Sequence, residues 1–168
     1  MIGCGCDVCR SSDPRDKRLR SSVLVEHEGL TILVDAGPDF RQQMLRTDVR
    51  TIDAILLTHE HKDHTGGLDD VRAFNFVDYP TIRPVDIYAT PRTMACIRKD
   101  YDYAFAPNPY RGVPQMELHE FGVDSFQIDG VEFQVSHVIK DLNKVPVDET
   151  NSKVLIGHHY LEPVGTEK

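Results

Sequence analysis

The sequence predicts a single domain of mixed α/β structure. Apolar runs of strand length alternate along the chain with segments of helical periodicity. The 168 residues are 40% hydrophobic and 27% charged, which suffices for one core and argues against a disordered or membrane protein. No segment repeats. We therefore expect one domain over residues 1–168, with a cysteine-rich and basic stretch at 1–20.

The first predicted elements are a hairpin, a helix and a buried strand. Two β-branched or apolar runs, 23–25 and 31–34, flank a turn in which Gly29 can take a positive φ. Pro38 suits the first position of a helix, because apolar residues recur after it at helical spacing. The run IDAILLTH at 52–59 then predicts a buried strand.

The second half continues the alternation of helices and strands. The predicted elements are, in order, a helix at 65–76, a strand at 83–90, a helix at 91–105, a hairpin at 125–138 and a strand at 152–160. Pro91 suits the first position of its helix. Asp129 and Gly130 separate two alternating runs, which favours a type I′ hairpin turn.

A group of potential metal ligands follows the strand at 52–59. The motif H-x-H-x-D-H supplies His59, His61, Asp63 and His64 within six residues. Imidazole and carboxylate groups on a loop at the end of a rigid strand can converge on a divalent cation. The alternative is a histidine-rich surface loop, but four donors at this spacing favour a metal site.

The residues around this motif resemble a known family. THEHKDHTGGLDD (58–70), preceded by TILVDAGPDFRQQ (31–43), is similar to the metallo-β-lactamase-fold hydrolases. The segment GCGCDVCRSSDPRDKRLRSSVLVE (3–26) resembles their branch of phosphoribosyl cyclic phosphate phosphodiesterases. The resemblance implies a metallo-β-lactamase-like αββα sandwich and zinc or manganese at a mono- or dinuclear site. It covers the first half of the chain well and the remainder poorly. Both ends are short relative to the family, which implies a shortened member with an incomplete second half.

The resemblance also implies roles for the residues of the motif. His59 and His61 would bind one metal, and Asp63 and His64 a second. Asp35 would support the loop from beneath.

Later ligands are implied by the same resemblance. His137, at the end of a hairpin strand, would complete the first ligand set, and His158 or His159 would supply the last ligand. Ordinary strand or surface histidines are the alternatives. The bridging aspartate of the family has no convincing counterpart, since Asp148 lies in loop-like sequence that favours a solvated residue.

Three cysteines form the pattern C-x-C-x-x-C. Cys4, Cys6 and Cys9 suit a tetrahedral structural zinc if a fourth donor joins them, and the resemblance implies a late histidine, His158 or His159. The alternative is three reduced surface thiols.

Other reactive residues carry weaker predictions. The basic run Arg15–Arg20 is expected to be a solvated face, although one of its arginines could guide a phosphate group. Cys96, His27 and His119 are expected to be structural.

Charge and composition limit the classes of substrate and partner that we expect. The formal net charge of −8 and pI near 5.4 disfavour nucleic acid and favour a small phosphoester substrate. The sequence shows no signal-peptide pattern and no apolar run of membrane-spanning length, so we expect a cytoplasmic protein without membrane partners. A missing sheet edge would expose apolar surface and favour a homodimer.

The expected reaction is metal-dependent hydrolysis of small phosphodiesters or cyclic phosphates. Asp63 would accept a proton from the attacking water, and His137 or His158 would protonate the leaving oxygen. Three alternatives stay open: the same fold acting on a thioester or lactam, a non-catalytic metal-binding remnant, and a zinc-stabilised interaction module.

Overall fold

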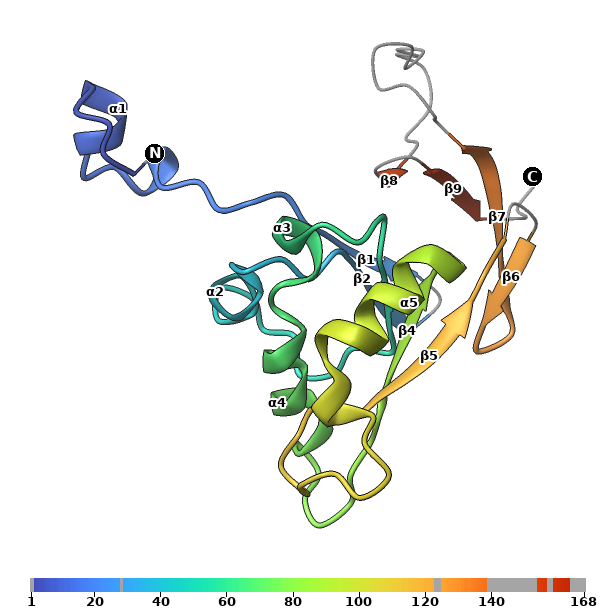
Figure 1. Ribbon diagram of the computed structural model, residues 1–168. Coiled ribbons are helices and arrows are strands. Elements are labelled where there is room, and N and C mark those ends of the chain that lie inside the picture. Colours follow the sequence, from blue (N-terminus) through green and yellow to red (C-terminus); the bar gives the residue numbers. More distant parts are fainter. Residues whose placement is uncertain (1, 28, 123–124, 139–153, 157–158, 164–168) are drawn as a thin grey trace.

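The computed structural model describes residues 2–27, 29–122, 125–138, 154–156 and 159–163. These residues form two sheets, one five-stranded in the order β1-β2-β3-β4-β5 and one four-stranded in the order β6-β7-β9-β8 (Figure 1). The strands are β1 Val23–His27, β2 Leu30–Val34, β3 Ala54–Leu56, β4 Val85–Ala89, β5 Met116–Glu120, β6 Ser125–Ile128, β7 Val131–Val138, β8 Val154–Ile156 and β9 His159–Pro163.

Short helices precede the first sheet and connect its strands. The α-helices are α1 Asp7–Arg10, α2 Phe40–Met44, α3 Lys62–Thr65, α4 Arg72–Asn75 and α5 Pro91–Asp100, and the 3-10 helices are η1 Pro14–Asp16, η2 Leu68–Val71 and η3 Asp102–Ala104. Strands β2 to β5 run parallel, and β1 pairs antiparallel with β2. The predicted alternation and first hairpin are thus confirmed, and Gly29 has a φ of 84°.

The helix starts were predicted with mixed success. α5 begins at Pro91, and the Thr90 side chain accepts a hydrogen bond from the Thr93 N–H, as expected of an N-cap. The prediction that Pro38 opens a helix is wrong. The Phe40 N–H bonds to the Gly37 carbonyl, so a turn around Pro38 precedes α2, which begins at Phe40.

Each face of the first sheet covers a separate apolar cluster. Leu33, Ile55 and Ile87 pack against the helices with Met94 and Ile97 of α5, all at most 1% exposed. The other face packs on the second sheet through a cluster made of Leu30, Ile32, Val34, Ala54, Leu56, Phe121, Ile128 and Phe133. The described layers are therefore α, β and β, as the metallo-β-lactamase-like sandwich predicts. None of the described helices covers the outer face of the second sheet (Figure 1).

Stacked rings join the two sheets. The ring of Phe126 on β6 lies with its centroid 5.6 Å from Tyr88, 4.7 Å from Phe121 and 5.7 Å from Phe133. Offset stacks of this kind stabilise the packing beyond the effect of the apolar area that they bury.

The predicted β6–β7 turn is confirmed, because Asp129 and Gly130 both have a positive φ, as a type I′ turn requires.

The end of the chain corrects one prediction. In place of a single strand at 152–160 there are two, β8 and β9, which pair antiparallel with Ile156 opposite His159. The prediction extended the apolar run Val154–Ile156 through the two histidines, although Gly157 after that run was a possible signal of a break. Among the described residues no helix has the length and apolar character needed to cross a bilayer.

Candidate metal centre

The H-x-H-x-D-H motif lies where three parallel strands end. Asp35 follows β2, Thr58 follows β3 and Thr90 follows β4. The backbone N–H of Asp35 donates to the carbonyl of Leu56 at 2.9 Å, which fixes the first two strand ends together. The carboxyl edge of a parallel sheet is where α/β folds commonly build their sites.

Asp35 is a buried anchor beneath the motif. It is 5% exposed and has a φ of 62°, a conformation that aspartate adopts more readily than most residues. Its carboxylate accepts hydrogen bonds from the Thr58 N–H at 2.9 Å and from the Thr58 hydroxyl at 2.9 and 3.0 Å. It also lies 2.6 Å from Nδ1 of His64. Asp35 therefore holds both the strand end and one histidine of the motif.

This network fixes which nitrogens the histidines present. Since a carboxylate only accepts, His64 donates through Nδ1, which leaves Nε2 as the nitrogen that its neutral form offers to a metal. The Thr58 hydroxyl donates to Asp35, so its oxygen accepts from Nδ1 of His59 at 2.9 Å. Both imidazoles consequently present Nε2 as a ligand atom, the arrangement that outer partners impose on metal-binding histidines.

The side chains of the motif gather at one place. The ring centroid of His59 lies 4.6 Å from that of His61 and 4.1 Å from that of His64. Nε2 of His64 is 3.4 Å from a carboxylate oxygen of Asp63. The structure thus brings the four predicted ligands to one place. They approach one another in pairs, and no three of their donor atoms all lie within 4.8 Å of one another.

A pocket opens beside the motif. Its volume is about 240 Å³, and it is lined by Thr58, His59, Glu60, His61, Thr90, Arg92 and Thr93. Arg92 Nη2 lies 2.5 Å from a carboxylate oxygen of Glu60. The pocket gives a small polar molecule access to the histidine side of the motif.

Two glycines allow the backbone to approach the motif closely. A Cβ built on Gly37 would collide with the carbonyl oxygen of Asp63. A Cβ on Gly67 would collide with the carbonyl oxygen of Gly37 and, at 2.6 Å, with Cβ of Phe40. Glycine at these positions is therefore required by space.

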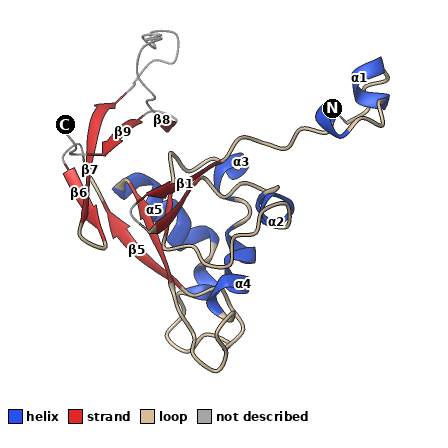
Figure 2. Cartoon of the chain, turned by 180° about the vertical axis from the view of Figure 1, so that it is seen from behind, coloured by secondary structure: helices blue, strands red, loops and turns tan. Residues whose placement is uncertain are grey.

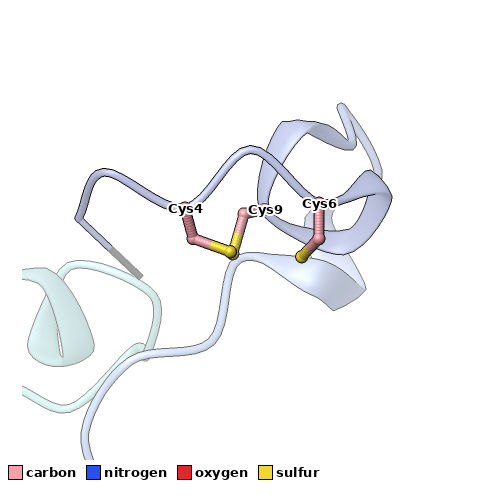
Figure 3. A group of neighbouring side chains, drawn as sticks. All are labelled: Cys4, Cys6 and Cys9. Atoms are coloured by element: carbon pink, nitrogen blue, oxygen red, sulfur yellow. The ribbon is translucent and has the colours of Figure 1, made fainter.

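The three cysteines of the N-terminal segment also converge. Sγ atoms of Cys4, Cys6 and Cys9 all lie within 4.8 Å of one another (Figure 3). Hydrogen bonding, chiefly from the Cys9 backbone, lowers the pKa of Cys6 to about 7. This segment, including α1, extends away from the sheets, at the opposite end of the molecule from β9 (Figures 1 and 2). The structure therefore does not bring His159 to the cysteines.

The late candidates are only partly described. The backbone of His137 lies in β7 opposite Tyr160, and that of His159 lies in β9 opposite Val138. His158 and Asp148 lie outside the described residues.

One further donor group was missed by sequence reasoning. Asp86 on β4 and Glu117 and His119 on β5 have ligand atoms within 4.8 Å of one another. His119 Nε2 lies 2.7 Å from Asp86 Oδ1, and its ring stacks on Tyr88 with centroids 4.7 Å apart. The signal was the E-x-H spacing opposite Asp86, which only the β4–β5 pairing makes visible.

Comparison with known proteins places the chain in a family. A model of the beta-lactamase superfamily domain matches residues 31–157. The crystal structure of a new diphosphatase from the PhnP family is 41% identical with a TM-score of 0.69, covering 82% of this chain and 51% of that one.

Two curated relatives show how much of a longer protein the chain matches. A ribonuclease Z of Mycobacterium sp. (strain KMS) is 30% identical over 149 residues, 81% of this chain and 50% of the relative. An octanoyltransferase of Porphyromonas gingivalis is 45% identical over 129 residues, which are 76% of this chain and 25% of that protein. The chain thus spans about half of the ribonuclease Z and the diphosphatase, and a quarter of the octanoyltransferase. Because the superfamily model matches more than half of its residues, the chain belongs to the beta-lactamase superfamily.

Proposed function

We propose that this chain carries a metal-dependent hydrolase site for small phosphodiesters or cyclic phosphates. One observation carries the proposal: Asp35 and Thr58 engage Nδ1 of His64 and of His59, so that both histidines present Nε2 toward the same region. A histidine-rich surface loop has no need of such a buried orienting network. The ribonuclease Z and diphosphatase relatives support phosphoester chemistry.

The donors present fit a divalent metal. Neutral imidazole and carboxylate suit zinc or manganese, and the pairing of His59 with His61 and of Asp63 with His64 suits two neighbouring positions. When bound, such an ion supplies a Lewis acid that promotes ionisation of water and offsets phosphoryl charge.

Side chains of this protein would bind the substrate and transfer protons. Asp63 has a side chain that is 60% exposed beside His64, a position from which it can accept a proton from water in the site. We assign protonation of the leaving oxygen to a late histidine, His137 or His158. The neighbouring pocket would receive the rest of the substrate.

The proposal is tested with His59→Ala. Purified protein loaded with zinc or manganese is assayed with bis-p-nitrophenyl phosphate, a five-membered cyclic phosphate, a thioester and a β-lactam. We expect turnover of the phosphoesters, and at least a 100-fold loss in the variant, because a ligand atom is removed. His27→Ala, on β1, is the matched control and should retain activity.

The outcomes separate the readings. Turnover of the thioester or lactam alone would overturn phosphoester specificity. Metal binding that depends on His59 without turnover of any substrate would identify a non-catalytic metal site. An unchanged metal content in His59→Ala would remove the site altogether.

A structural zinc at the cysteines is a separate expectation. Three convergent thiols, one with a pKa near 7, suit zinc once a fourth donor is supplied. Elemental analysis should find about one zinc fewer per chain in Cys4→Ser, with phosphodiesterase activity retained. Equal zinc content in Cys4→Ser and the unaltered chain would show that the thiols bind none.

A further inference from the structure

The loop that carries His61 is tied to both ends of one helix. Glu60, directly before His61, pairs with Arg92 in the first turn of α5 at 2.5 Å. Lys62, directly after it, pairs with Asp100, the last residue of α5, at 2.6 Å. The two residues that flank a proposed metal ligand are thus held by opposite ends of the same rigid element.

Two of the charges on α5 do not serve the helix itself, unlike Arg98 and Lys99 in its last turn. A helix favours acidic groups in its first turn and basic groups in its last, because its amino end is partially positive and its carboxyl end partially negative. Arg92 and Asp100 have the opposite signs at those ends. Their signs instead complement Glu60 and Lys62 of the loop.

A buried contact supports the same loop from below. Tyr101, 5% exposed, donates its hydroxyl to the Thr65 carbonyl at 2.7 Å, and the Thr65 hydroxyl donates to the His61 carbonyl at 3.1 Å. Burial raises the pKa of Tyr101 to about 12, which keeps the hydroxyl a donor at neutral pH. The Lys62 ammonium lies 5.4 Å from the Tyr101 ring centroid, which adds a cation–π contact.

We propose that α5 is a brace that positions His61 for metal binding, with Arg92 and Asp100 as its positioning residues. The inference rests on the proposed metal site and adds residues that are not metal ligands but act on His61 through the loop. Side chains of Arg92 and Lys62 are 82% and 61% exposed, so the pairs are screened by salt and each is modest in strength. Their effect is directional, since together they restrict movement of His61 along α5.

The test reverses one charge in a direction that suits the helix. Asp100→Lys places a favourable charge at the carboxyl end of α5 but repels Lys62. In a Cys4→Ser background, which removes the thiol site, we expect the affinity for Co²⁺, measured by its visible absorption in a competition titration, to fall about five- to tenfold at low salt. The melting temperature of the metal-free protein should stay unchanged. The loss of Co²⁺ affinity should shrink in about 0.5 M salt, because salt screens the interaction between exposed charges.

Two further variants decide the cause. Lys62→Asp/Asp100→Lys restores an opposite pair and should recover the Co²⁺ affinity and spectrum. Lys99→Glu reverses a charge on the same helix, where the side chain forms no ion pair or hydrogen bond with the described part of the chain, and should leave the affinity unchanged.

Each result bears on one proposal or the other. If the Cys4→Ser chain binds no Co²⁺, the proposed metal site fails. If it binds Co²⁺ and Asp100→Lys binds equally well, the brace is overturned while the metal site stands. The brace is also overturned if the double variant does not recover, or if Lys99→Glu weakens binding as much as Asp100→Lys.

Discussion

Replacing Asp35 with alanine is expected to lower the free energy of unfolding by about 3–5 kcal/mol, because it removes one partner of a buried charged network. The Thr58 N–H and hydroxyl would lose their acceptor, and alanine would have to adopt a φ of 62°. Metal affinity should fall roughly 10- to 100-fold as His64 loses its orienting partner. Urea unfolding and a competition titration measure the two effects.

The variant Asp35→Asn distinguishes the effect of the backbone conformation from that of the carboxylate charge. Asparagine tolerates the same φ and keeps one acceptor oxygen, so its unfolding free energy should lie between those of the unaltered chain and of Asp35→Ala. If the free energy of unfolding of Asp35→Ala lay within about 1 kcal/mol of that of the unaltered chain, the network would not support the fold.

Replacing Gly67 with alanine is expected to be about as damaging, at roughly 3 kcal/mol or more, because the added methyl group meets backbone that cannot move aside. Its neighbours are the Gly37 carbonyl and Phe40, which is 1% exposed. Because Gly37 itself lies against the Asp63 carbonyl, the shift would reach the motif and reduce metal content. Thermal or urea unfolding, with elemental analysis, measures both effects.

Gly122→Ala is the matched control for this prediction. A Cβ at Gly122 meets nothing within 4 Å, so the variant should change stability by less than about 1 kcal/mol. Equal losses from Gly67→Ala and Gly122→Ala would mean that chain entropy, and not the close approach behind the motif, sets the cost.

Local signals predicted parts of both sheets and the start of α5. Pro91 marked the start of α5 because its fixed φ and missing N–H suit a first helical turn. Asp129 and Gly130 marked the β6–β7 turn because both accept a positive φ. The motif at 59–64 was placed correctly at a strand end, since an apolar run leads directly into it.

The predictions that failed depend on contacts between distant segments. The sequence of α2 does not show that the helix begins at Phe40 and that Pro38 lies in the turn before it. The group around His119 exists only because β4 and β5 pair in one register, 31 residues apart at Asp86 and Glu117. The brace likewise joins residues more than 30 positions apart, such as Glu60 and Arg92.

The backbone conformation of Asp35 restricts mutational drift at this position. A φ of 62° is accepted at low cost by glycine, asparagine and aspartate, whereas β-branched and bulky side chains are strained there. Of those three, aspartate alone offers an ionised carboxylate to Thr58 and His64 at once. Backbone shape and acceptor chemistry thus select the same residue independently, and a chain that relinquished its chemistry would still be confined by geometry to a narrow choice of amino acids.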